Sequence, residues 1–303
     1  MRSTADILRS VELPARDAYD LPSSPKRFAD GGQYRIEIPS CEGPRAMEAV
    51  VAAAREHGIA IHRISQGSGA MLQTGDEIRR MVALGREQGI EVCLFVGPRA
   101  NWDVGVQAAS SAGKVIGSSL RGADQLAYAI EDVRHAESLG VRSVLVADVG
   151  QLMVLGKMKA AGDLPADFVL KISVTLAAAN PATARVLEDL GATSINLPVD
   201  LALAQIAAIR HAVDAAIDFY VEAPDDFGGT VRYYEIADLV RVAAPIYLKF
   251  GVRNAPALYP SGQHIESTVI ALSRERVRRA AIGMAMLKRF APDAVASPIA
   301  VRA

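Results

Sequence analysis

The amino-acid sequence predicts a single closed (β/α)8 barrel of the TIM type, with an open doubly wound sheet as the alternative. Eight short β-branched runs alternate with alanine-rich stretches of helical period between residues 34 and 290. Four of these runs follow a glycine placed to end a helix, so the same junction recurs along the chain. No glycine-rich dinucleotide fingerprint follows the first run, which argues against the open sheet and against bound NAD.

The predicted strands are short apolar runs that begin after a turn or a helix end. They are YRIEIPS (34–40), IAIHRIS (59–65), IEVCLFV (90–96), VRSVLVAD (141–148), FVLKISVTL (168–176), TSINLPV (193–199), IDFYVEA (217–223) and IYLKFGV (246–252). The glycines that precede four of them are Gly58, Gly89, Gly140 and Gly191. Because glycine adopts a left-handed backbone easily, it is the usual residue where a chain leaves a helix.

Two helix starts are also legible. Thr74 with Glu77 three residues later forms the pattern of a capping box. Asn180 followed by Pro181 combines a cap residue with proline at the first helical position. These signals predict that helices begin next to residues 75 and 181.

The chain divides into a polar N-terminal extension (1–33), the barrel (34–290) and a C-terminal tail (291–303). One connection, 98–122, is much longer than the others and contains Trp102, the single tryptophan. Long loops often carry function, so we expect either a lid over the barrel mouth or a packed excursion.

Composition narrows the classes of partner. Half of the residues are apolar, the formal net charge is −1 and the sequence pI is near 6.5. This balance predicts a small-molecule substrate and neither nucleic acid nor a membrane surface as partner. With only two cysteines, Cys41 and Cys93, we expect a cytoplasmic protein without an iron–sulfur cluster. The N-terminus lacks the apolar core of a signal peptide, and no later run is long enough to span a membrane.

Two lysines stand in the middle of predicted strands, where a long cationic side chain is rarely buried without a partner. Strand side chains alternate between the two faces of a sheet. In the eighth strand this alternation turns Tyr247, Lys249, Gly251 and Arg253 inward, and in the fifth it turns Lys171, Ser173 and Thr175 inward. Both lysines therefore point into the same barrel interior.

The same alternation places further polar groups inside, namely Arg35, Glu37, Asp148, Ser194, Asn196, Asp218, Tyr220 and Glu222. In a closed barrel the eighth strand lies between the seventh and the first, so Lys249 is expected between Glu222 and Glu37. Lys171 is expected beside Asp148 and Asn196. Each buried cation then has a carboxylate within reach.

The second strand is ambiguous, because either Arg63 with Ser65 or His62 with Gln66 points inward. We take Arg63, Ser65 and Gln66 as candidate substrate-binding residues, together with Asn196. The glycine- and serine-rich loop 65–70 offers backbone amides that could cradle an anion, although a tight turn explains it as well.

Two further loops follow the last strands. The loop 222–229 carries Asp225 and Asp226, which favour a cation, an amine or sugar hydroxyls. After the eighth strand come Arg253, Asn254 and His264, which could hold an anion next to a helix start.

The candidate catalytic residues are Lys249, Glu222, Asp148, Lys171 and Glu37. Catalytic groups of barrel enzymes come from the C-terminal ends of several strands, whereas barrel interiors are usually filled by branched apolar residues. A lysine beside carboxylates keeps its charge and holds an anion or donates a proton. The alternative is a structural network of ion pairs, in which removal of one partner destabilises the fold by about 3–5 kcal/mol.

A divalent metal on Glu37, Asp148, Glu222 and His62 is an open alternative, although no HExxH motif and no calcium loop is present. The last predicted helix, within 267–290, has an arginine-rich and an apolar face. It is typical of a solvated barrel helix and could also support a homo-oligomer.

The eight-unit layout, opened by YRIEIPS and closed by YLKFGVRNAPALYPSG, resembles barrel proteins grouped with the U32 peptidase family. This resemblance covers residues 34–290 and implies a barrel enzyme classified as a peptidase, with a four-cysteine iron–sulfur cluster in some members. The chain departs from that branch because it has only Cys41 and Cys93.

The sequence thus predicts an enzyme for a small polar or anionic metabolite that uses lysine and carboxylate groups, of the lyase or isomerase kind. A hydrolase of amide or peptide bonds is the first alternative, as the family resemblance implies. A barrel that binds a small molecule without turning it over is the second.

Overall fold

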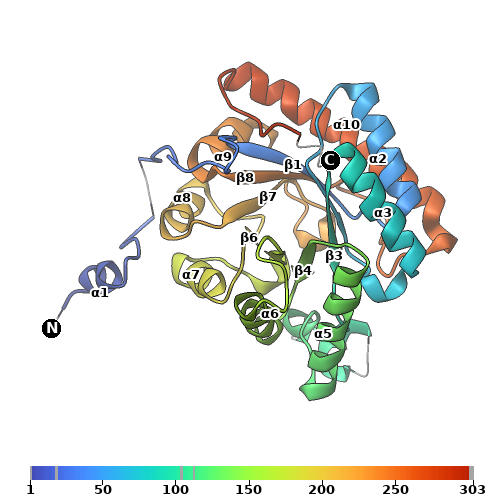
Figure 1. The fold of residues 1–303 in the computed structure, drawn as a ribbon. Helices are drawn as coiled ribbons and strands as arrows, with labels where there is room; N and C mark the ends of the chain where they lie inside the picture. Colours follow the sequence, from blue (N-terminus) through green and yellow to red (C-terminus); the bar gives the residue numbers. More distant parts are fainter. Residues whose placement is uncertain (1, 18–19, 103–104, 112, 300–303) are drawn as a thin grey trace.

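Eight parallel strands close on themselves in chain order, and helices surround them as an outer ring (Figure 1). The computed structural model describes residues 2–17, 20–102, 105–111 and 113–299. The strands are β1 Tyr34–Pro39, β2 Arg63–Gln66, β3 Glu91–Phe95, β4 Ser143–Val146, β5 Val169–Ile172, β6 Ser194–Asn196, β7 Ala216–Glu222 and β8 Ile246–Phe250. The predicted closed barrel is confirmed, and the open sheet is excluded because β1 pairs with β8.

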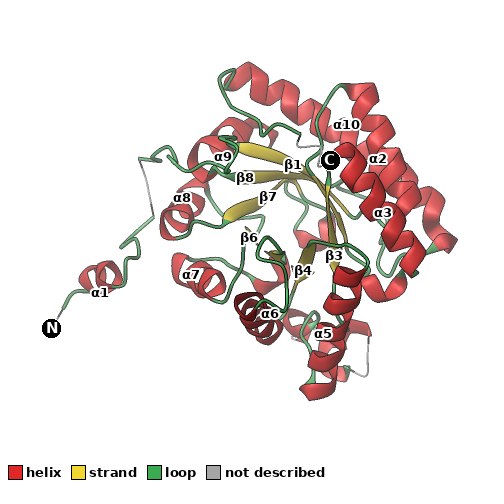
Figure 2. Cartoon of the chain, viewed as in Figure 1, coloured by secondary structure: helices red, strands yellow, loops and turns green. Residues whose placement is uncertain are grey.

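The helices lie in the connections between strands, as Figure 2 shows by colour. Their bounds are α1 Thr4–Ser10, α2 Pro44–His57, α3 Gly75–Gln88, α4 Val106–Ala109, α5 Gly122–Ser138, α6 Val149–Ala161, α7 Pro181–Asp189, α8 Leu203–Ala212, α9 Ile236–Ala243 and α10 Glu266–Phe290. Helix α1 has no buried residue and stands away from the ring in Figure 1.

The predicted helix ends are confirmed. Thr74 and Glu77 form a reciprocal capping box at the start of α3, and Asn180 caps α7 with Pro181 at its first position. Gly58 and Gly89 end α2 and α3 in the left-handed region, with φ of 64° and 67°. A residue with a Cβ would be strained at that φ, so glycine lets each helix stop where its strand must begin.

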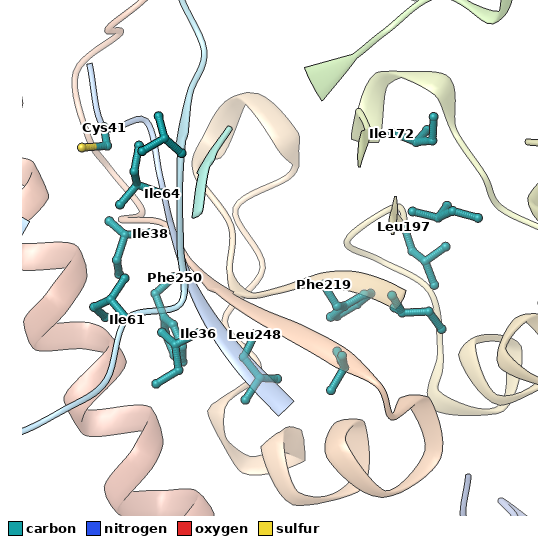
Figure 3. Close-up of a cluster of buried hydrophobic side chains, with 14 of the residues drawn as sticks. Ile36, Ile38, Cys41, Ile61, Ile64, Ile172, Leu197, Phe219, Leu248 and Phe250 are labelled. Atoms are coloured by element: carbon teal, nitrogen blue, oxygen red, sulfur yellow. The ribbon is translucent and has the colours of Figure 1, made fainter. Parts of the chain in front are cut away.

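The core lies between the strands and the helices. Figure 3 shows outward strand side chains such as Ile36, Leu248 and Phe250, which are fully or almost fully buried. Their alternation with inward polar residues is the pattern that the sequence predicted. The apolar face stabilises the fold, which leaves the inner face free to carry charge.

The long loop 98–122 contains short helical turns, Ala100–Trp102 and Gly113–Ile116, on either side of α4. Residues 103, 104 and 112 of this loop lie outside the described residues, so its predicted role as a lid stays a prediction. No helix among the described residues is both long and apolar enough to cross a membrane.

Candidate active site

Strand register sorts the inward side chains into layers, with four residues from alternate strands in each, as is typical of this barrel. The pairings of β1 with β2 and β8, continued around the barrel, give three successive layers. The middle layer consists of Glu37, Cys93, Lys171 and Asp218. The layer toward the N-terminal end consists of Arg63, Ser143, Ser194 and Tyr247. The layer toward the C-terminal end consists of Ser65, Leu145, Asn196 and Lys249. Lys249 is thus one layer nearer the C-terminal mouth than Lys171.

Glu37 is the centre of the buried polar network. Both of its carboxylate oxygens accept hydrogen bonds from Lys171 Nζ, and Oε1 also accepts from Ser65 Oγ. Arg63 Nη1 lies 3.3 Å from Oε2, and Lys249 Nζ lies 3.6 Å from Oε1. Burial alone would raise the pKa of Glu37, but the ammonium of Lys171, with Lys249 and Arg63, outweighs it and holds that pKa well below its usual value.

Asp218 and Glu91 complete the network. Asp218 accepts from Arg63 Nη1 at 3.0 Å and from Ser194 Oγ, while Lys171 Nζ lies 3.8 Å away. Arg63 also donates to both oxygens of Glu91, at 2.8 Å from Nε and 3.3 Å from Nη2. Sequence reasoning placed Asp218 inside but gave it no role, and it overlooked Glu91, which the alternation of the third strand would have shown.

The interior is therefore neutral. Its three cations, Arg63, Lys171 and Lys249, face three carboxylates, Glu37, Asp218 and Glu91. Such a balance is what a buried ionic network requires, since an uncompensated charge would be strongly destabilising.

Lys249 is held more loosely than the other two cations. With the Asn196 amide oriented to satisfy both neighbours, its oxygen accepts from Lys249 Nζ at 2.7 Å and its nitrogen donates to the Asp218 carbonyl at 3.3 Å. The ammonium also lies 4.1 Å from the centre of the Tyr220 ring. Leu145, in the same layer, is half-buried, whereas Ser65, Asn196 and Lys249 are buried.

Glu222 does not lie beside Lys249, and that prediction is wrong. The register of β7 shifts between Tyr220 and Glu222, so Glu222 pairs with Phe250, whose side chain faces the helices. Its Oε2 accepts from Tyr233 at 2.7 Å, and its Oε1 accepts from the backbone amide of Arg253 at 2.9 Å. The bulge at this point reverses the alternation on which the prediction rested.

Asp148 does not lie beside Lys171, so that prediction is also wrong. The fourth strand ends at Val146, and Asp148 is the N-cap of α6. Its oxygens accept from the backbone amides of Gln151 at 2.9 Å and Leu120 at 3.1 Å. An aspartate two residues past a strand caps the next helix here and does not point into the barrel.

The ambiguity in the second strand is resolved in favour of Arg63 and Ser65. Gln66 is buried but binds only the backbone of Gly69, through both ends of its amide. His62 accepts from the amide of Ile36 at 3.0 Å, and its Nε2 lies 2.9 Å from the carbonyl oxygen of Ser297, at the N-terminal end of the barrel.

The remaining candidates lie on the exposed rim. Arg253 pairs with Asp225 at 3.2 Å, and the amide of Asn254 binds the same carboxylate. His264 is exposed in a short turn before α10. The loop 65–70 does cradle a carboxylate, but it is the chain's own Glu42, which accepts from the amides of residues 67 and 68 at 2.7 and 3.0 Å.

Arg99 is the main residue that sequence reasoning missed. It follows β3, only 8% of its surface is exposed, and its guanidinium lies between the rings of Phe95 (3.6 Å) and Trp102 (3.8 Å). It donates to the Ser68 carbonyl at 3.2 Å, and no carboxylate of the described residues forms an ion pair with it. Burial lowers the pKa of Arg99 to about 10, although the charge of Glu42 acts in the opposite direction.

Phe95 belongs to the inward layer above Lys249, with Pro39, Ser173 and Tyr220, by the same register. Arg99 therefore caps the C-terminal mouth, and Lys249 lies below it.

The metal site considered on Glu37, Asp148, Glu222 and His62 does not assemble, because these side chains point to different places. Within the described ranges no group of three or more His, Cys, Asp or Glu side chains is placed to hold a metal ion.

The sequence profile of peptidase family U32 matches residues 115–223. The chain is similar to the U32 peptidase family. The match runs through β4 to β7, about a third of the chain. No curated protein matches the sequence.

The comparison with one solved structure supports the barrel fold. The YdjI aldolase from Escherichia coli K12 has a TM-score of 0.53 and 14% sequence identity over 85% of this chain and 94% of that one. The U32 peptidase Mk0906 has a TM-score of 0.42 and 18% identity over 68% of this chain and 74% of that one. At such identities the likeness concerns the barrel and not the chemistry.

Proposed function

We propose that this chain is an enzyme of the lyase or isomerase kind that acts on a small anionic metabolite at the C-terminal mouth of the barrel. The observation that carries the proposal is the position of Lys249. It is the network cation nearest the mouth, and the oxygen of Glu37 is 3.6 Å away, beyond ordinary hydrogen-bond distance. Its ammonium therefore keeps donor capacity for a substrate, whereas Lys171 uses its own on Glu37.

The chemistry follows from a fixed positive charge beneath a binding site for an anion. When the proton on the carbon next to a carbonyl is transferred to solvent water, or a carbon–carbon bond there breaks, the electron pair of the broken bond moves onto the carbonyl oxygen. An ammonium already directed at that oxygen stabilises the developing charge without reorganising. Lys249 fills this role in the proposal, and Arg99 holds the anionic group that keeps the substrate in place.

The ammonium of Lys249 donates to Asn196 and lies 3.6 Å from Glu37, so the proposal gives it the role of a donor and not of a Schiff-base nucleophile. Treatment with borohydride in the presence of carbonyl substrates should leave the protein unmodified. A trapped adduct at Lys249 would replace the proposed role with that of a nucleophile.

The test is proton exchange in heavy water. The protein is incubated in D2O with 2-oxo acids, hydroxy acids and their phosphate esters, and loss of the proton next to the carbonyl is followed by NMR. We expect exchange with at least one compound, and its loss in Lys249→Met but not in Lys288→Met, which changes an exposed lysine of α10. Equal exchange by Lys249→Met would refute the assignment.

A hydrolase of amide or peptide bonds remains the second candidate, because the U32 profile matches residues 115–223. It predicts cleavage of small peptides or amides and no exchange of carbon-bound protons. Hydrolysis of a peptide panel that Lys249→Met does not slow would favour this candidate over the first.

A further inference from the structure

A cavity lies at the N-terminal end of the barrel, opposite the mouth near Lys249. Its volume is about 320 Å3, within the range of sites for small organic molecules. It opens beneath the lowest inward layer, to which Arg35, Glu91 and Val169 belong, and is bounded by the end of α3 and the start of β4. Catalytic sites of such barrels are found at the other end, so this cavity is separate from the site of Lys249.

Segments outside the regular barrel form one wall. Asp30 comes from the extension before β1, and Pro298 comes from the chain after α10. The backbone of Ser297 pairs with that of Tyr34, and Ser297 Oγ donates to Asp30 at 2.9 Å. The two ends of the described barrel thus meet at the cavity, which is a built feature and not a gap between loops.

The other lining groups are mainly apolar or backbone. The apolar members are Val82, Ile90, Val92, Val141, Val169 and Pro298. Glycines at 85, 89 and 140 let the backbone come close. A ligand in this space would bury an apolar body.

Most charged groups around the cavity already have partners. Arg35 binds Asp30 at 2.8 Å and the Tyr247 hydroxyl at 3.0 Å. Glu91 is paired with Arg63, and Arg142 lies 3.1 Å from Glu137.

His62, also in the lining, uses both ring nitrogens on backbone groups. Burial lowers the pKa of His62, so it adds no charge at neutral pH.

Arg86 differs from these groups. Its side chain makes no hydrogen bond or ion pair with another group in the described part of the chain. A Cβ placed on Gly140 would lie 3.0 Å from Arg86 Nη2, so the guanidinium rests against the one residue that leaves room for it. The cavity therefore combines apolar walls with the exposed guanidinium of Arg86, which forms no ion pair in the described chain, and with the carboxylate of Asp167.

We infer that the cavity binds a small organic carboxylate with an apolar body, whose single negative charge pairs with Arg86. A phosphate ester carries nearly two negative charges, and among the described residues Arg86 is the one arginine of the lining without an ion pair, so the second charge has no partner there. A monoanion matches this single guanidinium. The inference does not depend on the proposed function.

The experiment uses the full chain and indole-3-acetate as the probe, with indole-3-acetamide as its neutral match and phenyl phosphate as the dianion. Binding is measured by calorimetry. We expect one molecule of indole-3-acetate per chain, and up to about five-fold weaker binding of the amide, as the loss of one partly exposed ion pair predicts. Phenyl phosphate should bind more weakly than the carboxylate.

Arg86→Gln should lower the affinity for indole-3-acetate to that for the amide. Arg79→Gln changes an exposed arginine of the same helix that does not line the cavity, and it should leave binding unchanged. Val169→Phe should weaken both indole compounds by occupying the space. No binding by the unaltered chain, tighter binding of phenyl phosphate, or an Arg86→Gln variant that binds like the unaltered chain would each overturn the inference. Lys249→Met should bind the probe normally, so failure at one end of the barrel does not imply failure at the other.

Discussion

The two interior lysines can be separated by what their removal does to stability. Lys171 is fully buried and bound to both oxygens of Glu37, with Asp218 at 3.8 Å. Lys171→Met changes the neutral interior to a net charge of −1, with three carboxylates, Glu37, Asp218 and Glu91, facing Arg63 and Lys249. Removing one partner from a buried pair costs about 3–5 kcal/mol. At about 2 °C per kcal/mol for a chain of this size, the midpoint of thermal unfolding should fall by about 6–10 °C.

Lys249→Met should be milder. This variant also leaves a net charge of −1, but Glu37 keeps its hydrogen bonds from Lys171, Ser65 and Arg63, and the losses are the hydrogen bond to Asn196 and the longer ion pair with Glu37 at 3.6 Å. A single such bond contributes about 1–2 kcal/mol, so the midpoint should fall by about 2–4 °C.

Differential scanning calorimetry of both variants, with Glu37→Gln and the double variant Lys171→Met/Glu37→Gln, completes a cycle. The double variant should be more stable than the sum of the two single losses predicts, because it removes both members of the closest pair. If Lys249→Met loses as much stability as Lys171→Met, or if the double variant shows no coupling, the distinction between a structural and a functional lysine is wrong.

Three further outcomes follow from other contacts. Glu222→Gln should lower the free energy of unfolding by about 1–2 kcal/mol, through its bond with Tyr233, yet keep any turnover that Lys249→Met abolishes. Arg99→Met should leave the free energy of unfolding unchanged or raise it, because the variant removes a buried cation without an ion pair. It should raise KM more than it lowers kcat. A loss of stability above about 2 kcal/mol would contradict the first expectation. Burial holds the pKa of His62 in the folded protein below its value in the unfolded chain. The contribution of neutral His62 to stability should therefore be fully present above about pH 6.5 and decline as the pH falls below that value. His62→Asn should flatten this decline in melting curves from pH 8 to 5.

Alternation along the strands was enough to predict the barrel and most of its interior. Lys171, Lys249, Glu37 and Arg63 are brought together by a two-residue period that depends only on apolar neighbours facing the helices. The period fails where the backbone departs from a regular strand. The bulge before Glu222 has no composition signal in the sequence.

Asp148 shows a different limit. A strand end and a helix cap are two residues apart, and the sequence alone does not say on which side of that boundary an aspartate falls. Arg99 shows a third limit of sequence-based prediction. Its burial depends on two aromatic rings, that of Phe95 in β3 and that of Trp102 in the loop after it. No periodicity connects a loop residue with the layer that it covers.

A buried charge without an ion-pair partner indicates a possible binding site, whereas a buried charge that is paired does not. The six ionic groups of the interior compensate one another, so a ligand is not needed to keep them buried. Arg99 at the C-terminal mouth and Arg86 at the N-terminal cavity are different, because neither has a carboxylate partner in the described chain. In the proposals above, an anion at either place gains an ion pair that the described residues do not form. Lys249 lies between these two ends, one layer nearer the C-terminal mouth than Lys171, and this position is the reason for proposing that a substrate meets it from the mouth.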